Sequence, residues 1–492
     1  MFRIRFPRVF PAFLCFSMLL AGSALAQSHS SAKLAPVPAL LLSDIHFEPF
    51  ADPGKAPQLA AAPVSEWQAI LSAAPSPDSA LRFAALQQQC HSKGEDTTYT
   101  LFASSLQAMR AQAVGVKFIT VSGDLMAHQF DCKFNALFPH AAPGDYRAFA
   151  EKTLAYVQSE LTTAFPGVPL YIALGNNDSD CGDYQLDPHS AFLADEGKTV
   201  SAGFPAPERA AAQHSFAAGG YYSVALPAPM RSTRLLVLND IFMSKSYSTC
   251  AGQPDPAGAE EQLTWLRQQL VEARTRHEKV WVMGHIPPGV NLYSTASKGT
   301  NVCAGKKPIM FLNSEELPNL LTEYGHEISL ALFGHTHMDE LRLLQPEGGK
   351  KNSGSAAIAL KIVPSISPVH GNRPTFTVAQ IDPATAELKD YRVIAASNLT
   401  GIAAEWREEY DFAKAYNEPA FDRASVEDLV KGFNADPGSA SPSSHQYLHN
   451  VFTGGMIPIL KLFWSQYACS LGHTSAADYA ACVCATPSVG GE

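Results

Sequence analysis

Five short apolar runs, each followed at once by a small polar block, constrain this chain more than any other feature of its sequence. The runs cover residues 38–43, 116–122, 169–174, 279–283 and 328–333. Each has the length of a β-strand and is apolar throughout, as is typical of strands in a sheet covered on both faces. Helical patterning lies between them, near residues 98–113, 144–164 and 258–276. Strands that alternate with helices predict an α/β fold.

The polar blocks carry residue types that bind metal ions. They read Ser43-Asp44-Ile45-His46, Gly123-Asp124, Gly175-Asn176-Asn177-Asp178, Gly284-His285 and Gly334-His335-Thr336-His337. In a sheet of this kind the carboxyl ends of the strands border one crevice, so the blocks should converge there. Each block alone is weak evidence, because a lone buried histidine is more often an ordinary core residue. Together they supply enough oxygen and nitrogen ligands for two neighbouring divalent cations that share one carboxylate.

This ordered set resembles the calcineurin-like metallophosphoesterase superfamily over residues 38–340. The resemblance implies a four-layer αββα sandwich that holds two divalent metal ions, with zinc, manganese and iron as the candidates. It also implies how the ligands divide: Asp44, His46 and His337 for one ion, Asn176, His285 and His335 for the other, and Asp124 as the bridge. Asp178 is a candidate acceptor for a ligating histidine or, equally, a turn-capping residue.

Within that superfamily the chain is similar to the acid sphingomyelinase-like branch. The segment Gly123-Asp124-Leu125-Met126-Ala127-His128 matches that branch's GD-x-x-A-H motif, which implies that His128 lies beside the scissile phosphate and is catalytic. The chain departs from the family at Asn177, where most members have histidine. An asparagine amide can donate a hydrogen bond to a phosphate but cannot act as a general acid near neutral pH. We therefore expect Asn177 and His128 to bind the substrate and His128 to supply the acid.

These features predict an exported metal-dependent phosphoesterase that hydrolyses phosphodiester or phosphoanhydride bonds. The resemblance implies attack by a hydroxide that bridges the two metal ions, without a covalent enzyme intermediate. Two alternatives stay open. One is a non-catalytic phosphoryl-ligand binding protein that retains the fold, with Asn177 as its main support. The other is a sphingomyelinase-type phosphodiesterase that acts on a lipid headgroup.

The N-terminal residues 1–26 have the pattern of a secretory signal peptide. Arg3, Arg5 and Arg8 precede a short apolar run that ends in Ala24-Leu25-Ala26, a small-x-small cleavage site. We therefore expect a periplasmic or secreted protein without a transmembrane segment after cleavage. The net charge of −10 argues against binding to duplex nucleic acid, which needs a concentrated basic surface. We expect a monomer that acts on a small phosphorylated substrate.

The cysteines agree with export, because an oxidising compartment favours disulfide bonds. The pairing of the cysteines that follow the signal peptide cannot be read from the sequence. Five of them lie before residue 310 and three after residue 460, so full pairing needs a bridge between these two regions. We expect bridges among the first five to rigidify the loops around the site.

The sequence pattern changes near residue 396. Residues 38–395 are expected to form the metallophosphoesterase catalytic domain, and residues 396–492 a helical C-terminal extension or subdomain. Its helices are predicted near residues 401–418, 425–435, 444–466 and 475–483, with Pro-, Gly- and Ser-rich segments between them.

Overall fold

The computed structural model describes residues 1–5, 7, 35–230, 232–346, 348, 355–453 and 458–485. Residues Met1–Leu34 and Ala35–Glu492 form two separate units, and the described regular secondary structure lies in the second. The expected signal peptide, residues 1–26, lies outside the described residues except for 1–5 and 7.

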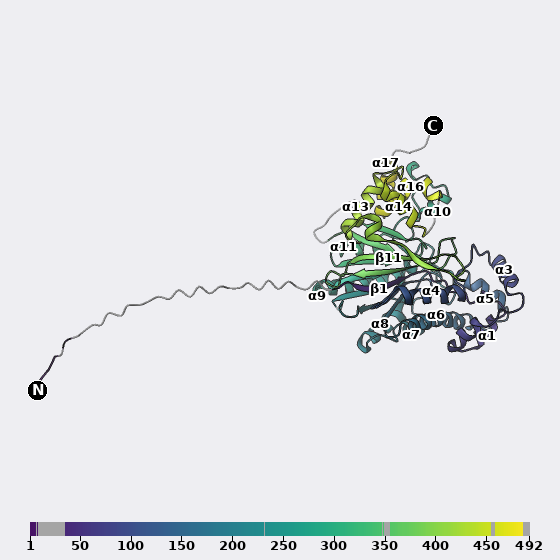
Figure 1. The fold of residues 1–492 in the computed structure, drawn as a ribbon, viewed down its shortest axis with the longest axis horizontal. Helices are drawn as coiled ribbons and strands as arrows, with labels where there is room; N and C mark the ends of the chain where they lie inside the picture. Colours follow the sequence, from purple (N-terminus) through teal and green to yellow (C-terminus); the bar gives the residue numbers. More distant parts are fainter. Residues whose placement is uncertain are drawn as a thin grey trace. The chain divides into compact units, whose positions relative to one another are not determined.

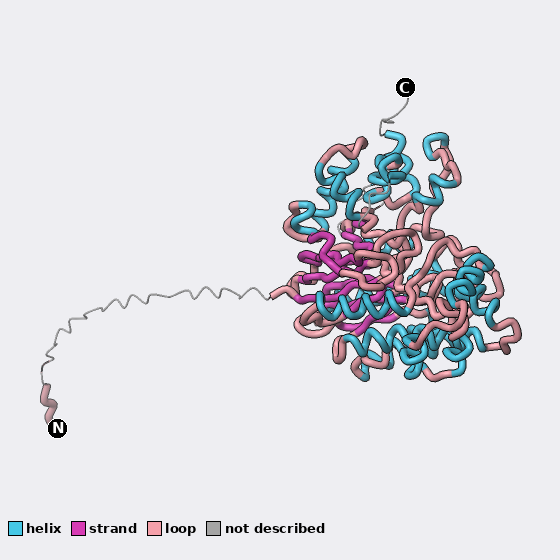
Figure 2. The backbone as a smooth tube through the Cα atoms, turned by 45° about the vertical axis from the view of Figure 1, so that its right-hand side comes forward, coloured by secondary structure: helices cyan, strands magenta, loops and turns pink. Residues whose placement is uncertain are grey.

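Two six-stranded sheets form the centre of the second unit (Figure 2). In spatial order the first sheet contains β12 (Trp406–Asp411), β11 (Leu388–Ala396), β10 (Thr375–Ile381), β1 (Val37–Leu42), β2 (Ile119–Ser122) and β3 (Leu170–Ala173). The second contains β4 (Tyr222–Ala225), β5 (Thr233–Val237), β6 (Lys279–Met283), β7 (Ile328–Phe333), β9 (Ile358–Ile362) and β8 (Glu340–Leu344). The five predicted apolar runs are β1, β2, β3, β6 and β7. Neighbours among them pair in parallel, so their carboxyl ends reach the same edge of each sheet.

The two sheets pack face to face because their strands are apolar on both sides. Phe118, directly before β2, contacts Trp281 of β6 with ring centroids 5.7 Å apart. The indole nitrogen of Trp281 donates a 2.7 Å hydrogen bond to the carbonyl of Ala386, in the turn between β10 and β11. All three residues are buried. This interface forms the two inner layers of the predicted αββα sandwich.

Helices supply the outer layers (Figure 1). The predicted helices are confirmed as α4 (Tyr99–Gln112), α6 (Asp145–Ala164) and α9 (Ala257–Arg276). Helix α7 (Ala191–Val200) contacts β3 of the first sheet, and α9 contacts β5 and β6 of the second. The other helices before residue 400 are α1 (Ala56–Ala61), α2 (Trp67–Ser72), α3 (Ser79–Gln89), α5 (Phe130–Leu137), α8 (Ala206–Gly219), α10 (Leu292–Ser297) and α11 (Glu316–Glu323).

The C-terminal region differs from the prediction in two places. The helix predicted near 401–418 was wrong over Trp406–Asp411, which form β12 and pair antiparallel with β11. This is an edge strand whose Arg407 and Glu408 are exposed, and such charges suit an edge as well as they suit the outer face of a helix. The first sheet therefore continues past residue 395, the expected end of the catalytic domain.

The single helix predicted near 444–466 is replaced by shorter helices, because Pro458 begins a new one. The helices of this region are α12 (Phe412–Tyr416), α13 (Arg423–Asn434), α14 (Pro442–Asn450), α15 (Pro458–Leu462), α16 (Trp464–Gly472) and α17 (Ala476–Ala485). Helices α13 and α16 contact β8. These two helices lie near each other at the top of Figure 1.

All the cysteines after residue 27 are paired. The disulfides are Cys90–Cys132, Cys181–Cys250, Cys303–Cys484 and Cys469–Cys482. Cys303–Cys484 is the expected bridge between the two regions, and it ties α17 to the segment after α10. In the part of the chain that the structure describes, no helix has the length and apolar character needed to cross a bilayer.

Candidate metal centre

The seven predicted ligands lie at the carboxyl ends of the five apolar strands. Asp44 and His46 follow β1, Asp124 follows β2, Asn176 follows β3, His285 follows β6, and His335 and His337 follow β7. The two sheets present these ends to the same side of the sandwich. As a result, side chains from across the sequence come within contact distance of one another.

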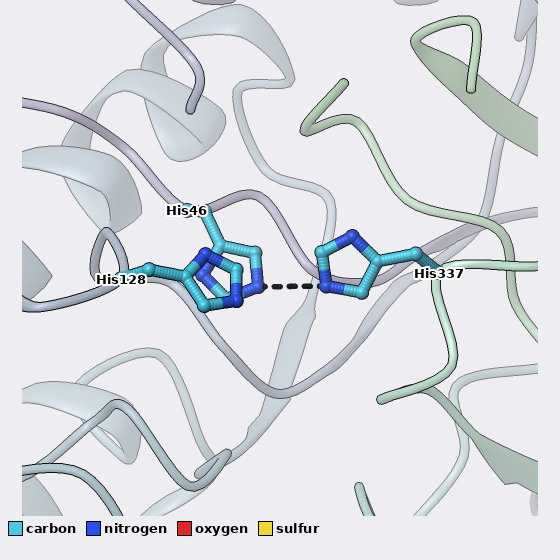
Figure 3. Close-up of side chains that lie close together, drawn as sticks. All are labelled: His46, His128 and His337. Carbon is cyan, nitrogen blue, oxygen red and sulfur yellow. Dashed lines mark hydrogen bonds between the residues drawn. The ribbon is translucent and has the colours of Figure 1, made fainter. Parts of the chain in front are cut away.

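One group of side chains is formed by Asp44, His46 and His337. The Nε2 atoms of the two histidines are 3.1 Å apart and face each other, as Figure 3 shows. Asp44 Oδ1 lies 3.4 Å from His337 Nε2 and 3.7 Å from His46 Nε2. All three residues are buried. Three donor atoms directed at a common point are the arrangement that a cation requires.

A second group is formed by Asn176, His285 and His335. His285 Nε2 lies 3.1 Å from Asn176 Oδ1. One ligand atom from each of His285, His335 and Asp124 falls within 4.8 Å of the others. His335 Nε2 is hydrogen-bonded to the Tyr184 hydroxyl at 3.2 Å, which leaves its Nδ1 for a cation.

Asp124 joins the two groups. Its Oδ2 atom lies 3.4 Å from His46 Nε2 in the first group and 3.2 Å from His285 Nε2 in the second. The carboxylate of Asp124 thus lies beside a histidine of each group, as expected of a residue that bridges two metal ions. The donor set of carboxylate oxygen, amide oxygen and imidazole nitrogen fits two divalent ions of the zinc, manganese or iron kind.

The electrostatics of the site favour nearby positive charge. Burial alone lowers the pKa of His285, but the carboxylate of Asp124 outweighs it and raises the pKa to about 10. Burial likewise opposes protonation of His46, yet Asp124 and Asp44 raise its pKa to about 9. Burial, reinforced by His285, lowers the pKa of His335 to about 3, which keeps this imidazole neutral, the form that binds metals.

The backbone at these positions is held in an unusual conformation. Asp44, His46, Asp124, His335 and His337 all have positive φ values, between 46° and 72°. Non-glycine residues adopt this left-handed region at an energetic cost, which is smaller for aspartate and histidine than for bulky residues. At these five positions it turns the chain sharply directly after a strand.

Hydrogen bonds from outside the ligand set fix the orientation of the rings. His46 Nδ1 donates to the carbonyl of Met126 at 2.8 Å, and His285 Nδ1 to the carbonyl of Ser122 at 2.7 Å. Each bond sets the tautomer so that Nε2 faces the site. The acceptors are backbone carbonyls, not the carboxylate of Asp178.

Asp178 instead ties two of the loops together. One carboxylate oxygen accepts hydrogen bonds from the backbone N–H groups of Leu125 and Met126, and the other from that of Gly175. Of the two roles considered for Asp178, the turn-capping one is therefore correct. Its burial, and then its proximity to Asp124, raise its pKa to about 7.

His128 lies over the first group. Its ring stacks on that of His46 with centroids 4.0 Å apart (Figure 3). Its Nδ1 and its backbone N–H both donate to Asp96, at 3.0 and 2.8 Å, which leaves Nε2 available to a ligand. Burial alone would raise the pKa of Asp96, but His128 holds it well below its usual range.

Asn177 lies against Asp124. Its side-chain amide donates to Asp124 Oδ2 at 2.9 Å, and its backbone N–H donates to Oδ1 at 2.8 Å. The neighbouring Asn176 amide donates to Asp183 Oδ1 at 2.7 Å, so its oxygen is the atom turned toward His285.

Several residues outside the predicted set of ligands and substrate-binding residues also border the site. They are Asp96, Asp183, Tyr184 and His370, whose ring centroid lies 4.7 Å from that of His337. None of them belongs to a strand-end block. Asp183 and Tyr184 follow the third block by only a few positions, and that proximity is the one signal that could have pointed to them.

Comparisons with known proteins place this chain among phosphoesterases. The sequence profile described as Calcineurin-like phosphoesterase matches residues 37–339. The chain is 25% identical to the acid sphingomyelinase-like phosphodiesterase 3b of Mus musculus over 458 residues, covering 90% of this chain and 89% of the relative. It is 24% identical to the cyclic GMP-AMP phosphodiesterase SMPDL3A of Homo sapiens, with 69% of each chain covered.

Among solved structures, a dimetal phosphatase from Danio rerio aligns with 76% of this chain and 99% of its own, with a TM-score of 0.37 and 12% identity. The profile match spans well over half of the chain and contains all seven side chains of the two groups. The chain belongs to the calcineurin-like phosphoesterase family, in its acid sphingomyelinase-like branch, and is therefore a hydrolase of phosphoric ester bonds.

Proposed function

We propose that this protein is an exported phosphodiesterase with a dinuclear metal centre, in which Asp44, His46 and His337 hold one divalent ion. The second ion is held by Asn176, His285 and His335, and Asp124 holds both. The observation that carries this assignment is the position of Asp124 Oδ2 between His46 and His285. When bound, the two ions would activate a water molecule and draw charge from the phosphate oxygens.

The protein's own groups then position the substrate and move the proton. His128 Nε2 faces the site while Asp96 holds Nδ1, so the ring keeps one orientation. From there His128 donates a hydrogen bond to the phosphate and a proton to the departing oxygen. Asn177 contributes a hydrogen-bond donor only, which leaves the acid role to His128.

The proposed bond is a phosphodiester or a phosphoanhydride in a small substrate. The relatives are named for phosphodiester cleavage in sphingomyelin-type and cyclic dinucleotide substrates, which supports a diester. A lipid headgroup is the second candidate because of the sphingomyelinase-like relatives.

The four disulfides support a periplasmic or secreted location, because disulfide bonds form and persist in oxidising compartments. The helices after Asp411 are proposed as the C-terminal subdomain.

The test is activity on bis(p-nitrophenyl) phosphate after reconstitution with Mn²⁺ or Zn²⁺, with metal content measured on the same samples. Asp124→Asn should lose bound metal and turnover together. His128→Ala should slow turnover by about a hundredfold while metal stays bound. His140→Ala, at an exposed histidine outside the site, is the matched control. A metal-loaded wild type that cleaves no diester, monoester or anhydride would favour the binding-protein alternative.

A further inference from the structure

Two consecutive residues in the loop after β3, Asp183 and Tyr184, contact two ligands of the second ion. Asp183 Oδ1 accepts a 2.7 Å hydrogen bond from the side-chain amide of Asn176, whose oxygen then faces His285. The backbone N–H of Tyr184 donates to the carbonyl of Asn176 at 2.9 Å. The same two residues therefore hold Asn176 at its side chain and at its backbone.

The side chain of Tyr184 reaches the second of these ligands. Its hydroxyl lies 3.2 Å from His335 Nε2, and the two rings meet edge to face. When Nδ1 of a neutral imidazole binds a cation, Nε2 carries the proton and can donate it to an outer acceptor. The Tyr184 hydroxyl oxygen is that acceptor here, so it fixes both the tautomer and the orientation of the His335 ring.

The backbone of Tyr184 has a φ of 57°, in the left-handed region. This region costs a bulky residue more than it costs glycine or asparagine, so the backbone alone does not favour a tyrosine at this position. The N–H of Gln185 donates to the carbonyl of Gly182 at 3.0 Å and closes the turn around it. The contact between the Tyr184 hydroxyl and His335 gives a physical reason for a tyrosine in this turn.

The turn is anchored to a second loop on its outer side. The N–H of Ser248 donates to the carbonyl of Tyr184 at 3.1 Å, and the N–H of Leu186 donates to the carbonyl of Ser248 at 3.2 Å. The disulfide Cys181–Cys250 joins the same two loops covalently. The positions of Asp183 and Tyr184 thus depend on contacts outside the strand-end blocks.

The ligands of the first ion are supported in a different way. His46 Nδ1 donates to a backbone carbonyl in the segment that follows β2, at 2.8 Å. Within the described residues, neither Asp183 nor Tyr184 forms a hydrogen bond with a ligand of the first ion. The turn therefore supports one ion of the pair and not the other.

We propose that Asp183 and Tyr184 are positioning residues for the second ion, which hold Asn176 and His335 in the orientation that binds it. The first ion binds without them. The proposal rests on the dinuclear centre proposed above and separates its two ions by what supports them. A change in this turn should therefore give a protein that holds one ion firmly and the other weakly.

The test is a stepwise titration of metal-free protein with Co²⁺ against a competing chelator, followed by the visible absorption of bound Co²⁺. The wild type should show two binding steps. Asp183→Ala removes the acceptor for the Asn176 amide and should weaken one step by about 10- to 100-fold. Tyr184→Phe keeps the ring and removes only the hydroxyl, and it should weaken the same step by about tenfold. The other step should change by less than about twofold in both variants.

Conservative and matched variants separate positioning from a general effect on the loop. Asp183→Asn keeps an acceptor oxygen and should weaken the step less than Asp183→Ala does. Asp180→Asn neutralises another carboxylate of the same loop, and Tyr247→Phe removes a hydroxyl that donates to the carbonyl of Leu186 at 3.0 Å. Both of these controls should leave the two steps unchanged.

The disulfide offers a further comparison. Cys181→Ser/Cys250→Ser should weaken the same step as Tyr184→Phe, because it releases the turn from its anchor. Cys469→Ser/Cys482→Ser, which removes the disulfide between α16 and α17, should not. Excess Mn²⁺ should restore turnover of bis(p-nitrophenyl) phosphate to the Asp183 and Tyr184 variants, because positioning residues act only through the bound ion.

Equal weakening of both steps in Asp183→Ala and Tyr184→Phe, or no weakening in either, would overturn the proposal. If circular dichroism shows that Asp183→Ala fails to fold, Tyr184→Phe decides alone. A wild type that binds only one Co²⁺ would overturn the dinuclear centre and this proposal with it. A wild type that binds two ions but hydrolyses no phosphoester would overturn the proposed function only, since the titration still decides the role of the turn.

Discussion

Asp96 accepts two hydrogen bonds from His128, one from the backbone N–H at 2.8 Å and one from ring Nδ1 at 3.0 Å. Asp96 is fully enclosed, whereas the ring of His128 reaches the crevice. Ser367 Oγ completes the arrangement with a 2.8 Å hydrogen bond to the same carboxylate. The proposed acid is thus oriented by a residue from a distant insertion.

The first prediction concerns this orientation. Asp96→Asn should lower kcat on bis(p-nitrophenyl) phosphate by about tenfold to a hundredfold, because the ring of His128 loses its charged acceptor. Metal content should stay at the wild-type level, since Asp96 contacts no proposed ligand by hydrogen bond. Ser367→Ala, which removes only the hydroxyl contact, should have a smaller effect. A parallel loss of metal in Asp96→Asn would mean a structural role.

The second prediction concerns metal removal. Chelation should abolish turnover and lower the melting temperature, because ions that bind only the folded state stabilise it by about 4 kcal/mol at a thousandfold excess over Kd. Adding back Mn²⁺ or Zn²⁺ should restore both. Asp124→Asn provides the comparison: its melting temperature should not respond to chelator. Identical thermal shifts in the two proteins would contradict a centre built on Asp124.

The third prediction concerns Glu196, a buried carboxyl on α7 whose Oε2 has no hydrogen-bond partner in the described structure. Burial, and then Glu151, raise its pKa well above the usual value. The folded state therefore holds a proton that the unfolded state releases above about pH 4.5, so stability falls as pH rises. Glu196→Gln should raise the melting temperature at pH 8 and have little effect at pH 5.

The matched control for this variant is Glu66→Gln, at an exposed glutamate. The difference in melting temperature between Glu66→Gln and the wild type should be the same at pH 5 and pH 8. Should Glu196→Gln destabilise the protein equally at both pH values, the carboxyl would be ionised and paired in the folded state, against the prediction.

The fourth prediction concerns Gly334, the glycine that directly follows β7. A side-chain carbon at Gly334 would collide with Ser43 Oγ and come within 2.6 Å of Asp44 Oδ2. Gly334→Ala should therefore cost about 2 kcal/mol of stability and reduce metal binding, as measured by urea unfolding and metal analysis. Gly432→Ala on α13 meets open space and should instead stabilise by about 0.5–1 kcal/mol. Normal metal affinity in Gly334→Ala would contradict this prediction, because it would show that the loop after β7 accommodates the added methyl group without moving the ligands.

The central strands and the blocks that follow them could be predicted because their signals are local. A buried strand such as β7 is recognisable from six consecutive residues, and His335 and His337 follow it within a few positions. Counting alone showed that the cysteines can all pair only if one disulfide joins the two cysteine regions, and Cys303–Cys484 is that disulfide.

Other features depended on contacts that no local pattern encodes. Trp406–Asp411 has a charged pattern that suits either a helix face or an edge strand, and only pairing with β11 decided between them. Asp96 lies in an insertion that carries no recognisable motif. Its proposed role, to orient His128, depends on hydrogen bonds that form only in the folded structure. The sequence by itself determined where the five central strands form and which polar side chains directly follow them, because periodicity and residue type act over a few positions. The tertiary structure alone decided which residues outside those blocks meet them, such as Asp96 beside His128, since that depends on how each loop folds back.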